Sequence, residues 1–476
     1  MEPFEENDLQ EIEELAKKFQ EAVDNGQPAY FDNADIQDVI GFFLDTSDMF
    51  YCEKALTYAL QNFPNDPYIR LLRSKYYSFQ SKFVEAEKEL DYVEQNFEPI
   101  PELYIEKVIL AHICNKDINA IELLNKSLSL DQDIPETHLL LTHEYLMQNN
   151  KNQAVKHAIR AIQLDSYAAE DIKNLFVDFA ESDESQRRLL VDFFKVLTEE
   201  MPLSGSLWSG LGLAYVGVGD FANAIDAFQL QLSVDDNDVF AYVNIAESYY
   251  GMEDYEHAIE YFERANQSSE MLQFNVQLGR CYFKLQQYDK AMRYFMTARE
   301  EDPLYATYVI PDIVKLFKVQ GRFDEARAFL RDHLQRVPQD FIAIEELIDL
   351  LNPDHDDEEI KELCYTAINL MDNNLYPFFD FIVQYCCFNH YPDLGIELCE
   401  NYLDDPSLAQ SIHYFLAMLF IKKGQIEQGC EHLELALLTD NQRLNIDFLD
   451  INPDLKNIPE VARLINRYAP DSFLEN

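Results

Sequence analysis

The sequence predicts an all-α protein, a solenoid of about twelve helical hairpins in tandem. The first observation is composition: 47% of the 476 residues are hydrophobic, but only 13 are glycine and 18 are proline, which is typical of a helix-rich globular chain. The second is a spacing of about 34 residues between equivalent positions. The third is that large apolar residues within each interval follow helical periodicity. Because this length exceeds what one compact core usually covers, a repeat array is expected.

The repeat is clearest from residue 212 to residue 298. Here small residues recur at intervals of 34 and 33, and each is followed four residues later by phenylalanine. Extending this anchor in both directions gives twelve units over roughly residues 34–440. Two units near the N-terminus are short, and those at Arg188, Ile360 and Gly395 depart most from the pattern. The anchors are Ala55, Ala86, Ala120, Ala154, Arg188, Ala224, Ala258, Ala291, Ala326, Ile360, Gly395 and Gly429.

Each unit is predicted to form two antiparallel helices joined by a turn. In the unit that begins near residue 205, Trp208, Leu211 and Tyr215 form an i, i+3, i+7 stripe on one helix. A second stripe, which contains Phe228, follows a glycine-bearing turn. Gly212 in the first stripe permits close approach of the second helix, and an aromatic ring opposite it fills the remaining volume.

Three residues of this unit also match the start of a dinucleotide-binding turn. Gly217, Gly219 and Ala222 spell G-x-G-x-x-A, a turn that normally follows a β-strand. The preceding segment SLWSGLGLAY has helical periodicity instead, and the residues equivalent to Gly219 in the next two units are Glu253 and Gln286. The glycines are therefore expected to form a helix–helix turn, and no cofactor is predicted.

The unit pattern resembles the tetratricopeptide repeat. The resemblance implies a right-handed superhelix whose concave face binds a protein or peptide, but it does not specify the partner. The protein is therefore expected to be a non-catalytic scaffold or adaptor. The residues that match are Trp208, Leu211, Gly212, Tyr215, Ala224 and Phe228, and in a later copy Leu278, Gly279, Tyr282, Ala291, Phe295, Ala298 and Pro303.

Four parts are predicted along the chain. Residues 1–33 form a capping helix, residues 34–202 an N-terminal array, residues 203–440 a C-terminal array, and residues 441–476 a capping segment with a helix over 459–468. The boundary near residue 202 lies in TEEMPLSGS, residues 198–206, where Pro202 and Gly205 interrupt the pattern. The acidic run NPDHDDEE, residues 352–359, is predicted between two helices of one unit.

Charge and cysteine usage limit the classes of partner and compartment. The net charge of −50, from 87 acidic and 37 basic residues, repels phosphate backbones, so no nucleic-acid partner is predicted. The same charge supports an alternative function, an acidic chaperone or mimic that masks a basic protein surface. The first residues lack the features of an export signal and no apolar run could span a membrane. Eight scattered cysteines indicate reduced thiols and a cytoplasmic location; the oligomeric state is left open.

No motif for catalysis or metal binding is found. His143-Glu144 lacks the second histidine of H-E-x-x-H, and the acidic run at 352–359 lacks the EF-hand pattern. The densest group of soft ligands contains no C-x-x-C and is interpreted as core residues rather than a metal site. An enzyme with a cryptic carboxylate site remains the third hypothesis. The soft-ligand group consists of Cys386, Cys387, His390 and Cys399.

The resemblance also implies which residues bind a partner. In the family, positions 2, 5, 9, 12 and 13 of each unit face the concave groove. In one hypothesis, aromatic residues at these positions hold apolar side chains of the partner while lysine and arginine bind its carboxylates. In the alternative, the cations pair with acidic neighbours and the rings pack between repeats. The candidates are Phe240, Val243, Tyr250, Gln273, Arg280, Phe283, Lys284, Tyr308, Lys315 and Lys318.

One known binding mode of the family is not supported. Chaperone-binding members hold a terminal carboxylate with lysine at position 5 and asparagine at position 9 of one repeat. The corresponding pairs here are Ser209 with Leu213, Val243 with Glu247, and Val276 with Arg280.

Overall fold

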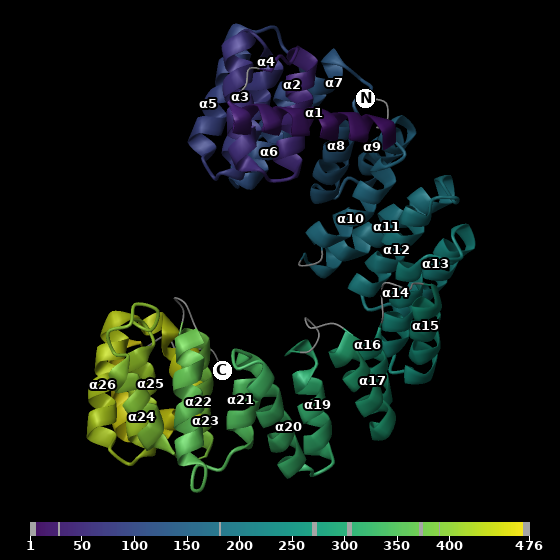
Figure 1. Cartoon of the computed structure of the whole chain (residues 1–476). Coiled ribbons are helices and arrows are strands. Elements are labelled where there is room, and N and C mark those ends of the chain that lie inside the picture. Colours follow the sequence, from purple (N-terminus) through teal and green to yellow (C-terminus); the bar gives the residue numbers. More distant parts are fainter. Residues whose placement is uncertain are drawn as a thin grey trace. The chain divides into compact units, whose positions relative to one another are not determined.

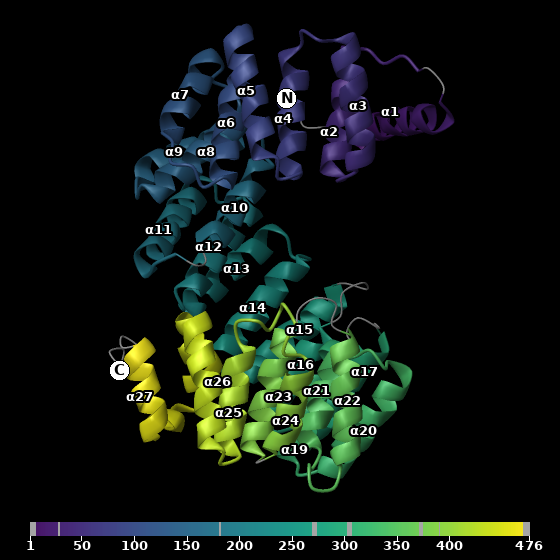
Figure 2. The same cartoon turned by 90° about the vertical axis from the view of Figure 1, so that its left-hand side faces the viewer.

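The computed structural model describes residues 6–26, 29–179, 182–268, 274–301, 307–370, 375–389 and 391–469. Over these ranges the chain forms helices joined by turns, without a β-strand. It divides into two compact units, unit 1 (residues 1–272) and unit 2 (residues 273–476). Consecutive helices within each unit pair as antiparallel hairpins (Figures 1 and 2). The predicted all-α class of repeated hairpins is confirmed.

In unit 1, a single helix precedes the first hairpin, and each later hairpin packs on its predecessor. Its helices are α1 (Glu6–Asn25), α2 (Asn33–Asp45), α3 (Met49–Asn62), α4 (Pro67–Phe79), α5 (Phe83–Asn96), α6 (Pro101–Ile113), α7 (Ala120–Leu130), α8 (Pro135–Met147), α9 (Lys151–Leu164), α10 (Ala168–Phe179), α11 (Glu184–Glu200), α12 (Gly205–Gly217), α13 (Phe221–Val234), α14 (Val239–Gly251) and α15 (Tyr255–Ser268).

Within its described residues, unit 2 contains five hairpins. Short 3-10 and π segments and a last α-helix follow them. Its elements are α16 (Asn275–Lys284), α17 (Tyr288–Glu301), α19 (Ile310–Val319), α20 (Phe323–Arg336), α21 (Phe341–Leu350), α22 (Asp357–Leu370), α23 (Tyr376–Phe388), α24 (Pro392–Asn401), α25 (Ile412–Lys422), α26 (Ile426–Thr439), η1 (Asn441–Arg443), η2 (Asn445–Leu449), η3 (Pro453–Asn457) and α27 (Pro459–Tyr468).

The turn inside most hairpins contains a residue with positive φ. Gly219 has φ of 76°, and its equivalents Glu253 and Gln286 have 62° and 60°. The Gly219 N–H donates to the Val216 carbonyl at 2.9 Å, as in a common way of ending helices. Because helix α12 rather than a strand precedes Gly219, this turn lacks the context of a dinucleotide-binding motif, as predicted.

A small residue on the first helix faces a phenylalanine on the second. A Cβ atom added to Gly212 would come closer than 3.0 Å to the ring of Phe228, and one added to Gly279 would meet Phe295 in the same way. Both rings are buried. The repeat signal in the sequence thus records a contact within each of these two hairpins, which confirms the predicted role of the two glycines.

The two ends cover the terminal hairpins. Helix α1 packs on α2 and α3 through Ala16 and Phe19, which are buried. The helix predicted over residues 459–468 is α27, and its Val461 and Ile465 are fully buried. Each end therefore removes apolar surface that a terminal hairpin cannot bury alone.

The irregular repeats also form consecutive helix pairs, but no described residue of their turns has the positive φ found in the other hairpins. The repeats anchored at Arg188, Ile360 and Gly395 correspond to α10 with α11, α21 with α22, and α23 with α24. The acidic run at 352–359 falls between α21 and the first turn of α22, as predicted. The interrupted segment at 198–206 lies within unit 1, between α11 and α12; the predicted division of the array at residue 202 stays a prediction.

Candidate functional site

The ten predicted partner-binding residues fall in both units. Phe240, Val243 and Tyr250 lie on α14 in unit 1, whereas Gln273 lies outside the described residues. The other six belong to unit 2, where they lie on α16, on α19 or just before α19. These are the first helices of consecutive hairpins, as the repeat register required.

Two of the four predicted cations in unit 2 are held by carboxylates. Arg280 pairs with Asp312 at 2.8 Å, and its guanidinium lies over the Tyr308 ring at 5.3 Å from the centroid. Lys318 pairs with both Glu346 at 2.9 Å and Asp349 at 2.8 Å. The alternative in which these cations pair with acidic neighbours therefore describes Arg280 and Lys318.

The other two cations are placed differently. Lys315 lies over the Phe283 ring, 5.6 Å from its centroid. Lys284 is exposed and has no ion pair among the residues that the structure describes. Lys284, Lys315 and the Phe283 ring thus remain as candidate contacts on this face of unit 2. In unit 1, Phe240 is exposed.

A carboxyl group with an unusual pKa lies on α21, the next first helix of unit 2. Burial raises the pKa of Glu345 from 4.5 to about 7, and the adjacent charge of Glu346 adds to the effect. The folded state therefore holds this proton more tightly than the unfolded chain does. Stability contributed by the protonated group is lost as pH rises from about 4.5 to about 7.

We expect Glu345→Gln to stabilise unit 2 by about 1 kcal/mol at about pH 8 and to change little at about pH 5, since partial exposure reduces the full effect. Hydrogen exchange of the α21 amides at both pH values measures this difference. Glu346→Gln is the matched control: it removes one of the two carboxylates that pair with Lys318 and should destabilise unit 2 slightly at about pH 8. Equal effects of Glu345→Gln at both pH values would contradict the assignment.

A second surface lies in unit 1, on the first helices α4, α6 and α8. Each of these helices begins with proline, has 13 residues and ends with an apolar residue. Residues 7 and 11 positions apart on an α-helix point within about 20° of each other, so positions 2, 9 and 13 of each repeat share one face. We call this surface the first-helix groove. Its members are Tyr68, Lys75 and Phe79 on α4, Glu102, Ile109 and Ile113 on α6, and Glu136, His143 and Met147 on α8.

The last residues of the three helices form an exposed apolar row. Phe79, Ile113 and Met147 are 60%, 50% and 48% exposed, and they recur at intervals of 34. Between α4 and α6, the side chains of Phe79, Ile109 and Ile113 line a pocket of about 260 Å³. A cavity of about 150 Å³ lined by aliphatic and aromatic groups can hold benzene, so this pocket can accept an aromatic or branched aliphatic side chain.

An ion pair lies at the base of the pocket. Lys75 Nζ is 2.8 Å from Glu106 Oε1, and the Glu106 side chain is 9% exposed. Burial raises the pKa of Glu106, and Glu136 contributes to the same shift, although Lys75 opposes it. The carboxylates near the pocket therefore outnumber its single ammonium group.

Further carboxylates lie along the same helices. Glu136 is exposed, and Oε2 of Glu102 is buried without a hydrogen-bond partner in the part of the chain that the structure describes. His112 Nε2 lies 2.9 Å from Glu144 Oε1 and joins α6 to α8. His143 and His112 lower the pKa of Glu144 against the effect of burial, so Glu144 adds negative charge to this face.

The sequence analysis missed the first-helix groove. Its signal was available, because the apolar row recurs with the repeat period at position 13. The groove carries no motif, because the residue types at positions 2 and 9 are not the same in all three repeats.

The cysteine group and the His143-Glu144 pair contain residue types that bind metals. Cys386, Cys387 and Cys399 are buried among apolar side chains, and burial raises the pKa of each thiol; His390 lies outside the described residues. Over the described ranges, no three histidine, cysteine or acidic side chains are grouped as metal ligands. None of the eight cysteines forms a disulfide within the described residues.

Comparison with known proteins connects part of the chain to a family. Residues 218–298 match the model of the anaphase-promoting complex, cyclosome, subunit 3 family. No curated protein matches this chain. Within the described residues, no helix is long and apolar enough to cross a membrane.

Several solved structures have similar helical arrays. A monomeric mutant of IFIT1 with Gppp-AAAA is 14% identical, with a TM-score of 0.32, and the match covers 76% of this chain and 95% of that one. The C-terminal part of a TPR repeat-containing protein from Cytophaga hutchinsonii is 13% identical, with a TM-score of 0.33 and coverage of 59% and 95%. MamA is 23% identical, with a TM-score of 0.25 and coverage of 36% and 92%.

Proposed function

We propose that this chain, whose hairpins are tetratricopeptide-like repeats, is a non-catalytic scaffold or adaptor that binds a protein partner on the first-helix face of unit 1. The observation that supports this most strongly is the exposed row of Phe79, Ile113 and Met147 beside an apolar pocket. Exposed apolar side chains cost solubility, and a contiguous patch of them commonly marks an interaction surface.

The chemistry of the groove indicates the kind of partner. Apolar side chains lie at the C-terminal ends of α4, α6 and α8, while Glu102 and Glu136 lie at the N-terminal ends of two of them. Positions 2 and 13 are about 16 Å apart along a helix. A segment that inserts an apolar side chain beside Ile113 and places lysine or arginine near Glu102 and Glu136 matches both features. We propose such a basic amphipathic segment as the partner.

The predicted residues of α14, α16 and α19 are proposed as further contacts. In unit 2, Phe283 with Lys315, Lys284 and the exposed Tyr308 would hold an apolar side chain near an acidic group of a partner. The free thiols are consistent with a reducing compartment, and we propose the cytoplasm.

Selection of random linear peptides on the immobilised full chain tests the proposal. Enriched peptides are expected to combine a large apolar residue with lysine or arginine. Ile113→Asp is expected to weaken their binding by at least about tenfold, because it places a carboxylate at the apolar row. Val84→Asp is the matched control, since Val84 is also exposed but lies on the second helix α5 of the α4 hairpin.

Two further measurements separate the surfaces and the modes of binding. Phe283→Ala with Arg280→Glu reports on the unit 2 contacts, so a loss there without a loss in Ile113→Asp would move the site to unit 2. If the chain instead acts as an acidic mimic, binding should fall steeply when salt rises from about 0.1 M to about 0.5 M, whereas apolar insertion should leave most of the affinity. Enriched peptides that are acidic would contradict the proposal.

A further inference from the structure

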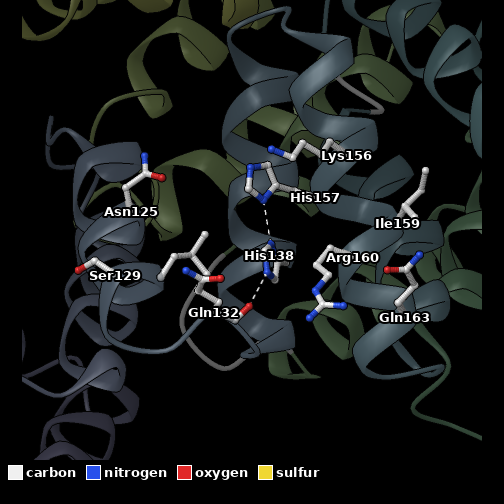
Figure 3. A pocket seen from close by; sticks show the side chains of 10 residues that line it. Asn125, Ser129, Gln132, His138, Lys156, His157, Ile159, Arg160 and Gln163 are labelled. Carbon is white, nitrogen blue, oxygen red and sulfur yellow. Dashed lines mark hydrogen bonds between the residues drawn. The ribbon is translucent and has the colours of Figure 1, made fainter.

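A second pocket of unit 1 lies between the helices α7 and α9. It has a volume of about 650 Å³ and reaches His138 of α8 at its base (Figure 3). Lys156 and Arg160, one turn apart on α9, point toward it, and Asn125 and Ser129 of α7 lie opposite. None of its lining residues is acidic, in a chain with 87 acidic and 37 basic residues. The pocket is therefore locally basic.

Among the described residues, one of the two cations of the pocket is paired with a carboxylate and the other is not. Arg160 pairs with Asp133, which lies outside the lining. Lys156 has no ion pair with any residue in the described ranges. Both cations act on the adjacent imidazoles: Lys156 helps to lower the pKa of His157, and Arg160 and Lys156 help to lower that of His138. The site therefore offers the unpaired charge of Lys156, and a bound anion would share Arg160 with Asp133.

The hydrogen bonds of the two histidines fix where their protons lie. His138 Nε2 is 3.1 Å from the Gln132 carbonyl, and a carbonyl can only accept, so this nitrogen carries the proton. His138 Nδ1 must then accept from His157 Nδ1, 2.8 Å away. The Nε2 atom of a neutral His157 is left without a proton. Burial, followed by His138 and Lys156, lowers the pKa of His157 to about 4, so it is neutral at physiological pH.

We propose that this pocket binds a phosphate-type oxyanion, held by Lys156 and Arg160 with His157 as a third donor when protonated. Lysine and arginine make strong charge-assisted hydrogen bonds to such groups. On the α7 side, the Ser129 hydroxyl donates to the Lys126 carbonyl and the Asn125 amide to the Ile121 carbonyl, so the anion is held from the α9 side. This proposal is independent of partner binding in the first-helix groove: the two sites share α8 but have no residue in common.

Binding of the anion should take up a proton. An anion stabilises the charged form of His157 and raises its pKa, so by linkage the anion binds more tightly as pH falls. The charged and titratable groups that face His157 are His138 and Tyr145 of α8 and Lys156 and Arg160 of α9, with Asp133 beyond Arg160. The α7 side of the pocket contributes no charge.

Unit 2 contains an internal control. His413 and His432 have the same 19-residue separation, and their Nδ1 atoms are 3.1 Å apart. The charges that act on His432 include Glu400 and Glu431, which raise its pKa, although burial and His413 lower it overall. Without a neighbouring basic pair, this site is not expected to bind an anion.

Titration of the full chain with inorganic phosphate, sulfate and O-phosphoserine, followed by calorimetry and by NMR of the histidine rings, tests the proposal. We expect saturable binding at one site, with the His157 ring resonances shifting and the His432 resonances unchanged. Sulfate keeps its charge across this range, so its affinity should rise about three- to tenfold as pH falls from about 7.5 to about 5.5. Tighter binding of O-phosphoserine than of inorganic phosphate would identify a phosphate ester as the ligand.

Lys156→Gln with Arg160→Gln should weaken binding at least about tenfold. Lys126→Gln with Arg188→Gln removes the same charge from two exposed cations that pair along their own helices, and should leave binding intact. His157→Gln should retain binding but lose its dependence on pH. Equal loss in both double variants, or unsaturable binding of all three anions, would overturn the proposal.

Discussion

Phe228→Ala is expected to destabilise the α12–α13 hairpin by about 3–5 kcal/mol, the largest effect of any substitution considered. The ring is fully buried and lies against Gly212, which has no side chain to fill the space that the ring leaves. Removal of a buried aromatic side chain costs its transfer free energy and leaves a cavity. Hydrogen exchange of the α12 and α13 amides in the full chain measures the loss, because it reports local stability in a multi-unit protein.

Glycine substitutions provide the controls for this contact. Gly212→Ala should destabilise the same hairpin by about 1–3 kcal/mol, since its Cβ would overlap the Phe228 ring. Gly41→Ala should stabilise α2 by about 0.5–1 kcal/mol, because a Cβ there meets open space within a helix. The double variant Gly212→Ala with Phe228→Leu should recover part of the loss. Equal effects of the two glycine substitutions would contradict a specific contact between Gly212 and Phe228.

Lys75→Met is expected to destabilise unit 1 by about 2–3 kcal/mol at about pH 8. It leaves the buried Glu106 carboxylate without its partner, 2.8 Å away in the native chain, and beside the charge of Glu136. Removal of one member of a buried pair costs more than removal of both. Denaturant unfolding at several pH values measures the change.

The pH dependence of this variant has a definite sign. Without Lys75, the folded-state pKa of Glu106 lies further above that of the unfolded chain, so the stability of the variant is lost as pH rises and partly recovered toward about pH 5. Glu106→Gln should cost less, because the remaining Lys75 is 41% exposed and can reach water. Lys75→Met with Glu106→Leu should restore most of the stability. A pH-independent loss in Lys75→Met would show that the pair contributes through packing alone.

Sequence periodicity predicted the hairpins because the repeat positions record contacts within a hairpin. Gly212 and Phe228 are neighbours in space for the same reason that they recur along the chain, and the helix over 459–468 was predicted from its apolar stripe and confirmed as α27. The turn at Gly219 was predicted from the register, in which Glu253 holds the equivalent position. Both residues have positive φ, which confirms the prediction.

Contacts between repeats were harder to predict. Arg280 and Lys318 were identified as candidate ligands for a partner, but their pairing with Asp312 and Glu346 depends on side chains about 30 residues away. A repeat register places helices beside one another without specifying which rotamers meet. The His138–His157 contact lies within the α8–α9 hairpin and was also missed, because the register does not specify side-chain rotamers there either.

The first-helix groove was missed on different grounds. Its residues differ in type from repeat to repeat, so no motif marks it, and only their common position and exposure reveal the row of Phe79, Ile113 and Met147. Partner-binding positions in a repeat protein vary while packing positions recur. Sequence analysis therefore detects the scaffold more readily than its binding surface.

Site-specific photocrosslinking from position 113 tests the central claim most directly. The full chain with p-benzoylphenylalanine in place of Ile113 is irradiated with a selected basic amphipathic peptide, and the same photoreactive residue at Val84 serves as the control. If the partner binds in the first-helix groove, position 113 crosslinks to the apolar residue of the peptide and position 84 does not. A peptide that binds with full affinity yet crosslinks equally from both positions, or from neither, would contradict the first-helix groove as the partner-binding site.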